Sequence, residues 1–299
     1  MSTPRRLFLQ SSAALAAGIA LPQEPPAPLL PTMRLGKYQV TRLIIGANPF
    51  YGYSHFNKLL SDHMLEWCTP ENVCKTLRQC EQNGINTWQF SQGGRGIQDL
   101  QRFREEGGKL HAFLLSGRPM EEDLSMLPRL AKLNLIGMVH HGGATDRRWR
   151  AGEQNKIKEF LKAVRDTGVL VGLSTHNPIV LETTEEQNWD IDFYMGCVYH
   201  VTRSKEELEK LLGQAPLGEP FLPNDPPRMF RAIRQSKKTC LAFKILAAGR
   251  VTDSPKQIDQ AFQTAFESIK PQDGVIVGMY PKFTDQVRDN AARVRRLLA

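Results

Sequence analysis

Side chains that can move protons gather where the short apolar runs of this sequence end. Imidazole, phenol and ammonium groups of this kind act as general acids and bases or stabilise negative charge. Four of the seven histidines follow three consecutive apolar runs. The candidates for catalysis are His140, His141, Tyr51, Tyr53 and Lys244, while His176 and His200 are the other two of these four histidines.

Three of these histidines could instead bind a metal. His141, His176 and His200 each follow a different apolar run, and three imidazoles with an open coordination position suit zinc or a related divalent ion. A bound water would then serve as the nucleophile of a hydrolase, lyase or isomerase. The sequence holds no local metal-binding motif, so this hypothesis needs the three segments to converge.

The apolar runs alternate with amphipathic stretches, which is typical of repeated βα units around a parallel sheet. Thr69-Pro70 and Ser254-Pro255 each place a capping hydroxyl before a first-turn proline, so both predict helix starts. Eight strands close a barrel, and the predicted fold is a (β/α)8 TIM barrel. The predicted strands are 43–47, 85–90, 110–115, 135–140, 169–173, 191–198, 240–246 and 274–277.

In such a barrel, reactive groups lie at the carboxyl ends of the strands, where all the candidate side chains fall. The longest irregular stretch, Gln214–Pro227, is rich in proline and glycine and lies between the sixth and seventh strands. Long loops at this end of a barrel usually cover the site. We therefore predict that Gln214–Pro227 is a lid.

The first residues have the form of an export signal. Arg5 and Arg6 precede a short apolar, small-residue stretch, which predicts a twin-arginine signal peptide over residues 1–20 and passage through the twin-arginine export machinery. Residues 21–32 are predicted to be a proline-rich linker, and residues 33–299 a single barrel domain. A periplasmic or extracellular location follows from this interpretation.

The composition excludes several classes of protein. The net charge is +8, and loss of Arg5 and Arg6 with the signal leaves +6, an excess that is spread along the chain and does not favour nucleic-acid binding. Five cysteines without a Cys-x-x-Cys pair argue against a disulfide scaffold or an iron–sulfur cluster. No apolar run after the signal is long enough for a membrane span. We expect the partner to be a small-molecule substrate.

Several segments, in order along the chain, resemble an aldo/keto-reductase barrel. Residues 33–46 are similar to the opening hairpin and first strand of that family, and Gly84-Ile85-Asn86 to the start of its second strand. Residues 135–141 resemble the strand that ends in the active-site histidine, and Val171–Ser174 the next strand. Residues 276–278 with 286–290 resemble the last strand and the adenine-side loop.

The resemblance implies a tyrosine, an aspartate, a lysine and a histidine at the active site, and three of them are not matched. Gln89 stands near the expected aspartate, Gly93 at the expected tyrosine, and Ser116 near the expected lysine. An amide cannot set the pKa of a neighbour as a carboxylate does, so the usual proton transfer is not supported. Only His140 or His141 fits the pattern.

The positions that bind the cofactor in that family are better matched in this sequence. The resemblance implies NADP or NAD, with the adenine near Gln286 and Asn290, a phosphate at Lys282 or at the helix start of Thr284, and the carboxamide at Ser174. A helix N-terminus offers free N–H groups and partial positive charge to such a phosphate.

Three functions remain open from the sequence. The first is an exported oxidoreductase of aldo/keto-reductase type that binds NAD or NADP and reduces a carbonyl or sugar-like substrate in a rearranged active site. In it His141 or His140 polarises the substrate, Tyr51 or Tyr53 is the acid, and Lys244 stabilises the developing charge. The second is the histidine metal site. The third is a non-catalytic barrel whose rim aromatics stack on a sugar: Phe50, Tyr51, Trp88 and Trp149.

Overall fold

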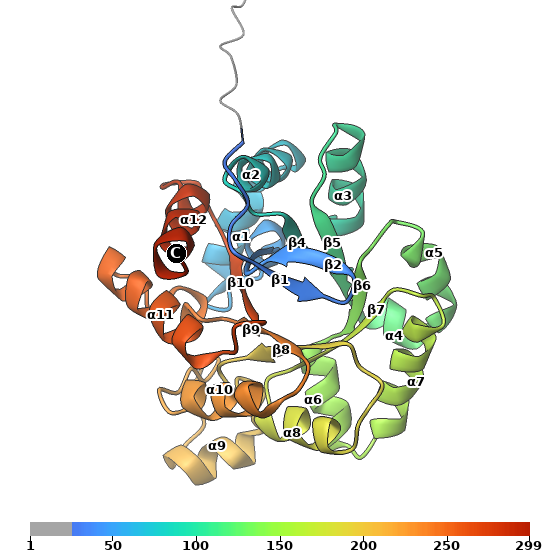
Figure 1. Cartoon of the computed structure of the whole chain (residues 1–299). Helices are drawn as coiled ribbons and strands as arrows, with labels where there is room; N and C mark the ends of the chain where they lie inside the picture. The colour runs from blue at the N-terminus through green and yellow to red at the C-terminus, as the bar shows by residue number, and fades with distance from the viewer. Residues whose placement is uncertain (1–25) are drawn as a thin grey trace, which may run out of the picture.

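A computed structural model describes residues 26–299 of the chain, and in them eight parallel strands close into a barrel (Figure 1). Neighbouring strands follow the chain order, and the last strand closes the barrel by pairing with the first, with Ile276 opposite Ile44. The predicted (β/α)8 fold is confirmed. The barrel strands are β3 (Leu43–Gly46), β4 (Thr87–Ser91), β5 (His111–Leu115), β6 (Gly137–His140), β7 (Leu170–Thr175), β8 (Phe193–Cys197), β9 (Thr239–Phe243) and β10 (Gly274–Gly278).

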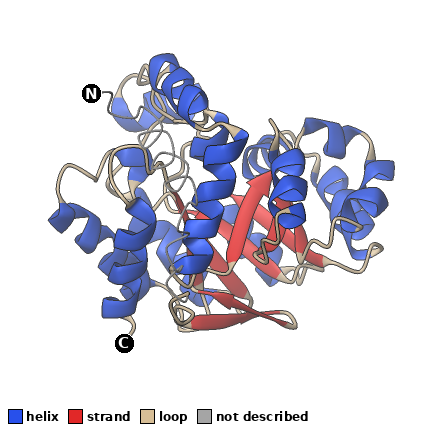
Figure 2. Cartoon of the chain, turned by 90° about the horizontal axis from the view of Figure 1, so that it is seen from above, coloured by secondary structure: helices blue, strands red, loops and turns tan. Residues whose placement is uncertain are grey.

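A ring of helices surrounds these strands in Figure 1, and the turned view of Figure 2 shows helices on both sides of the strands. The predicted caps are confirmed, since the hydroxyls of Thr69 and Ser254 accept hydrogen bonds from the first turns of α2 and α11. The helices are α1 (Lys58–Trp67), α2 (Pro70–Gln82), α3 (Gly96–Glu105), α4 (Arg118–Glu122), α5 (Leu127–Ala131), α6 (Gly142–Arg150), α7 (Gln154–Arg165), α8 (Pro178–Glu186), α9 (Lys205–Leu212), α10 (Asp225–Gln235), α11 (Pro255–Ser268) and α12 (Gln286–Leu297).

The hydrophobic core has two parts because barrel strands are buried on both faces. The larger part lies between the strands and the helices and includes Trp88, Phe103 and Phe160. The smaller part fills the barrel interior. It ends at the antiparallel hairpin of β1 (Thr32–Leu35) and β2 (Tyr38–Thr41), which covers the amino-terminal end of the barrel. The carboxyl-terminal end is thus the one free to hold a site.

The start of the described chain lies against the barrel. Within the predicted linker, Leu30 is buried, its backbone N–H donates to the carbonyl of Gly84, and that of Ala27 donates to Gln82. The predicted twin-arginine signal, residues 1–20, falls outside the described residues. No helix within residues 26–299 is long and apolar enough to cross a membrane. All five cysteines are buried as free thiols.

Candidate active site

A long cavity opens at the carboxyl-terminal end of the barrel. Its volume is about 880 Å³, within the range of small-molecule and cofactor sites. It begins in the barrel interior at Gly46 and Gln89, passes the segment after β9, and ends beside α11 and α12 at Ile258 and Arg293. The cavity therefore runs from the barrel axis to the outer helices, and its elongated shape suits an extended ligand.

Three of the five predicted cofactor residues line this cavity: Thr284, Gln286 and Asn290. The side-chain oxygen of Gln286 accepts a hydrogen bond from the backbone N–H of Tyr280, and Asn290 is buried at the wall. Two predicted residues are elsewhere. Lys282 Nζ lies 2.9 Å from Nε2 of His63, and Ser174 is buried inside the barrel mouth, where it lines no part of the cavity.

The cavity wall after β9 has an unusual backbone. Lys244, Ala247 and Ala248 have φ angles of 62°, 48° and 51°, in the left-handed region that non-glycine residues rarely adopt. The neighbouring Arg250 anchors this segment, because its guanidinium lies 4.0 Å from the ring centroid of Phe221 and donates to the carbonyl of His55. Local strain of this kind, about 1 kcal/mol or more per residue, is concentrated at functional sites.

The two candidate tyrosines lie in different environments. Tyr51 ends a short 3₁₀ helix (Asn48–Tyr51), is buried, and donates its hydroxyl to Asp99. Burial and the Asp99 carboxylate raise the pKa of Tyr51, and its side chain does not line the cavity. Tyr53 lines the cavity and is half-exposed, and a Cβ at Gly93 would lie 2.7 Å from its hydroxyl. The hydroxyl of Tyr53 therefore lies directly beside the backbone of Gly93.

The paired histidines point in opposite directions. His140 is fully buried behind the barrel wall, with Nδ1 2.7 Å from Thr145 Oγ1 and Nε2 accepting from Arg148. Burial, and then the Arg148 charge, lower the pKa of His140 to about 3, so this imidazole is neutral at pH 7 and faces away from the cavity. His141 lies at the barrel mouth and caps α6 through its Nδ1.

A buried carboxylate and imidazole form a pair beside His141. Asp146 Oδ2 accepts three hydrogen bonds: from Nδ1 of His176 at 2.8 Å, from the backbone N–H of His176, and from the hydroxyl of Thr202. Oδ1 accepts from Thr175. Burial alone would raise the pKa of Asp146, but the hydrogen bonds from His176 and Thr175 hold it below its ordinary value. Asp146 is therefore ionised.

The electrostatics keep these imidazoles neutral at pH 7. Burial lowers the pKa of His176, and the Lys244 charge adds to this effect, against the opposing hydrogen bond to Asp146. Burial also lowers the pKa of His141 to about 4, with His176 and Lys244 contributing. With Nδ1–H given to Asp146, the Nε2 of His176 presents a lone pair, as a general base does.

The predicted metal site is not formed. Among residues 26–299 no group of three histidine, cysteine, aspartate or glutamate side chains is arranged to hold a metal ion. The Nδ1 of His176 is bonded to Asp146, and His141 and His200 belong to different parts of the mouth, since only His200 lines a cavity with His176. The histidine metal-site hypothesis is therefore wrong for the described structure.

The predicted rim aromatics are not on the rim. Trp88 and Phe50 are fully buried, and their ring centroids lie 6.3 Å apart in the outer core. Trp149 packs against Trp189, and Tyr51 is buried on Asp99. With Phe50, Tyr51 and Trp88 buried, these three rings offer no exposed face on which a sugar could stack.

The predicted lid runs across the mouth. Within Gln214–Pro227, the last three residues are the start of α10, and the rest is irregular. Glu219 of this segment lies with Oε1 2.7 Å from Nδ1 of His55, which follows β3 on the far side of the barrel mouth. Burial would raise the pKa of Glu219, but the hydrogen bond with His55 lowers it. The segment is thus held by a hydrogen bond across the mouth.

Sequence reasoning missed Asp146, Glu219 and Arg250. Asp146 lies one and a half turns into the helix that follows His141, on the face toward the strands. An acidic residue at a buried position of an amphipathic helix is unusual, and this sequence signal could have identified it. Glu219 and Arg250 act on partners far away in the sequence, and no local pattern reveals them.

No protein-family model and no curated protein sequence matches the chain. Solved structures do resemble it. The glycerol dehydrogenase from Gluconobacter oxydans is 11% identical, with 90% of each chain covered and a TM-score of 0.51. A thermostable aldo-keto reductase in complex with the inhibitor epalrestat is 12% identical, with 89% of this chain and 98% of that chain covered and a TM-score of 0.52.

A barrel enzyme of another class is equally similar. The truncated 3-deoxy-D-arabino-heptulosonate 7-phosphate synthase from Thermotoga maritima is 12% identical over 90% of this chain and 91% of that one, with a TM-score of 0.51. At this identity the likeness extends to the TIM-barrel fold, which hosts many chemistries, and function has to be argued from the site.

Proposed function

We propose that this chain is an oxidoreductase of aldo/keto-reductase type that binds NAD or NADP and acts on a carbonyl or sugar-like substrate. The observation that carries the proposal is the cavity of about 880 Å³ that reaches from Gln89 in the barrel interior to Asn290 on α12. Its length suits a dinucleotide with one end at the barrel axis and the other between the outer helices. We also propose export through the twin-arginine machinery, on the basis of Arg5 and Arg6.

The nucleotide would be held mainly at the start of α12. Gln286 and Asn290 offer amides to the adenine, and Thr284, which is exposed just before α12, would lie beside a phosphate. Lys244 and Arg250 add positive charge along the wall. When bound, the nicotinamide would supply or accept the hydride at the substrate carbon.

The proton would come from a group in the same cavity. Tyr53 is the side chain that we assign, because its hydroxyl is on the cavity wall beside Gly93. Lys244 lines the same wall and would stabilise negative charge on the substrate oxygen. Such a site performs acid catalysis without the carboxylate that Gln89 replaces.

Nucleotide binding is the direct test. We expect NADH or NADPH to bind the purified protein in a calorimetric titration, and a Thr284→Glu substitution to weaken binding by about tenfold or more, since it sets a negative charge beside the phosphate. A negative charge near a helix N-terminus does not harm folding.

The control is Thr264→Glu, which makes the same change at an exposed position of α11 away from the cavity wall. It should bind as the unmodified protein does. Failure of both nucleotides to bind at millimolar concentration would overturn the proposal, and so would equal affinity of the two variants.

A further inference from the structure

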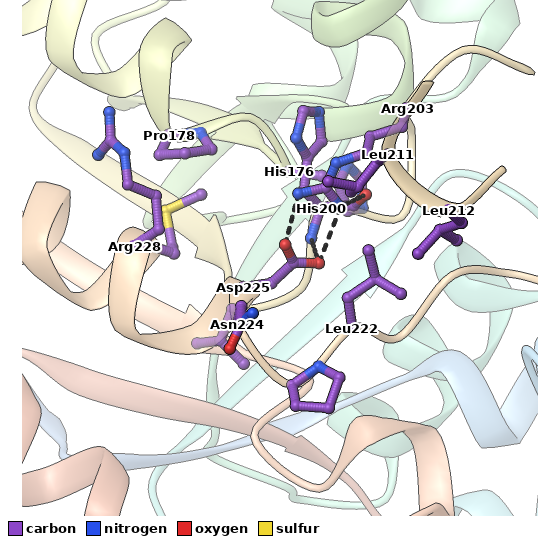
Figure 3. Close-up of a pocket in the computed structure, with 13 residues that line it drawn as sticks. His176, Pro178, His200, Arg203, Leu211, Leu212, Leu222, Asn224, Asp225 and Arg228 are labelled. Atoms are coloured by element: carbon purple, nitrogen blue, oxygen red, sulfur yellow. Dashed lines mark hydrogen bonds and ion pairs between the residues drawn. The ribbon is translucent and has the colours of Figure 1, made fainter. Parts of the chain in front are cut away.

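A second cavity lies beside the first, between the segments that follow β7 and β8 and the helices α9 and α10 (Figure 3). Its volume is about 410 Å³, which fits a small organic molecule. An aromatic contact links the walls of the two cavities. The ring of His176, on the wall of the second cavity, packs against that of Phe243, on the wall of the first, with centroids 5.6 Å apart.

The charged side chains of this second cavity are already paired. Arg203 donates from both terminal nitrogens to the carboxylate of Asp225, at 2.9 and 2.5 Å. Arg228 makes two hydrogen bonds of 2.5 Å to Glu182 in the same manner. Both guanidinium groups are therefore compensated, and the cavity offers no free charge to attract an anion or a cation. A charged ligand would lose its hydration without gaining a partner.

Neutral polar groups remain without a partner. Among residues 26–299, the Nε2 of His176, the ring of His200 and the amide of Asn224 have no side-chain hydrogen bond. Asp146 fixes the proton of His176 on Nδ1, so Nε2 can only accept. Burial and the Arg203 charge lower the pKa of His200 to about 4, which leaves that ring neutral with one donor and one acceptor.

The rest of the wall is aliphatic. It is formed by Val198, Leu222 and Met229 together with Leu211 and Leu212 at the end of α9. The α9 helix lies outside the ring of barrel helices in Figure 1, and Leu211 and Leu212 are 58% and 45% exposed. An apolar body seated in the cavity would cover these two side chains and gain stability from their burial.

We infer that the second cavity binds an uncharged compound with an apolar body and a hydroxyl group, whose hydroxyl donates to Nε2 of His176 while its body packs on Leu211, Leu212 and Leu222. The Asp146–His176 pair orients the acceptor, and His200 offers a second hydrogen bond. The inference needs no nucleotide, so it stands apart from the proposed function of the larger cavity.

Three probes with the same apolar ring test this inference: cyclohexanol, cyclohexanecarboxylate and cyclohexylammonium. Each is titrated into the mature chain, labelled with ¹⁵N-histidine, and the imidazole resonances are followed by NMR without nucleotide. We expect cyclohexanol to shift the His176 and His200 signals saturably, and both charged analogues to bind at least about tenfold more weakly. Charged analogues that bind as well as the alcohol would overturn the inference.

Two variants locate the binding. Leu222→Trp fills the cavity from the irregular segment, where a larger side chain does not threaten the core, and should abolish the saturable shifts. His111→Phe, at the opposite end of the barrel against Tyr38, is the control and should bind cyclohexanol unchanged. Saturable shifts that persist in Leu222→Trp would place the alcohol elsewhere and refute the site. Nucleotide binding by the same samples reports separately on the larger cavity.

Discussion

Lowering the pH from 7 to 5 is expected to reduce the free energy of unfolding by about 6 kcal/mol. Three buried histidines carry this effect, because burial lowers the pKa of His140 to about 3 and those of His141 and His200 to about 4. In the unfolded chain each would titrate near 6.5. Below that pH the unfolded state binds protons at these imidazoles, while the folded state keeps them neutral. The free energy of unfolding therefore falls as the pH falls.

The window of this loss lies between about pH 6.5 and pH 4, and the slope identifies the groups. Denaturant unfolding at pH 7, 6 and 5 measures it. In His140→Gln one titrating group is gone, and the slope should decrease by about 1.4 kcal/mol per pH unit. His63→Gln, at the partly exposed contact with Lys282, is the control. Equal stability at pH 7 and pH 5 would contradict the burial of these imidazoles.

The fold could be predicted from the sequence because its signals are local. Each strand is a short run of β-branched and aliphatic residues, and the caps at Thr69 and Ser254 act within one helical turn. The strand ends also set which loops meet at the mouth. Parallel strands carry their carboxyl ends to one face, so Lys244 and His141 could be assigned to that face without a structure.

Side-chain direction could not be predicted. Consecutive residues of a strand point to opposite sides, and nothing in His140-His141 indicates which ring faces the mouth. Tyr51 and Tyr53 are separated by one glycine with a φ of 72°, whose turn buries the first and leaves the second on the cavity wall. The sequence shows that two tyrosines follow the strand, but the path of the backbone decides which of them reaches the cavity wall.

Long-range partners were also beyond local patterns. Asp146 and His176 are 30 residues apart, and His55 and Glu219 are 164 apart. Whether a histidine acts as a metal ligand or as a base depends on the group that binds its other ring nitrogen. Here that group is far away in the sequence, so only the folded structure reveals it. The sequence alone therefore predicts a metal site for His176, and the structure shows an acceptor oriented by Asp146.

Replacing Asp146 by asparagine is expected to lower the free energy of unfolding by about 3 kcal/mol. The buried carboxylate accepts four hydrogen bonds, from Thr175, Thr202 and both N–H groups of His176. An amide of the same size has one accepting atom, and its NH₂ group would face donors. These donors join the segments after β7 and β8 to α6, so their loss loosens the mouth.

An exposed aspartate provides the matched control. Asp190 pairs with Arg165 at the surface, with its side chain 74% exposed, and Asp190→Asn should change stability by about 0.5 kcal/mol or less. Chemical denaturation of the three proteins at pH 7 gives the comparison. If Asp146→Asn is as mild as Asp190→Asn, the buried hydrogen bonds do not hold the mouth together.

A double-mutant cycle then separates the share of His176 in this loss from that of the threonines. If the carboxylate and the imidazole act as a pair, the combined Asp146→Asn and His176→Phe protein loses less than the sum of the single losses by about 1 kcal/mol or more. Additive losses would assign the stability to Thr175 and Thr202. In that case the proton of His176 would no longer be fixed on Nδ1 by Asp146, and its Nε2 would lose its defined role as an acceptor.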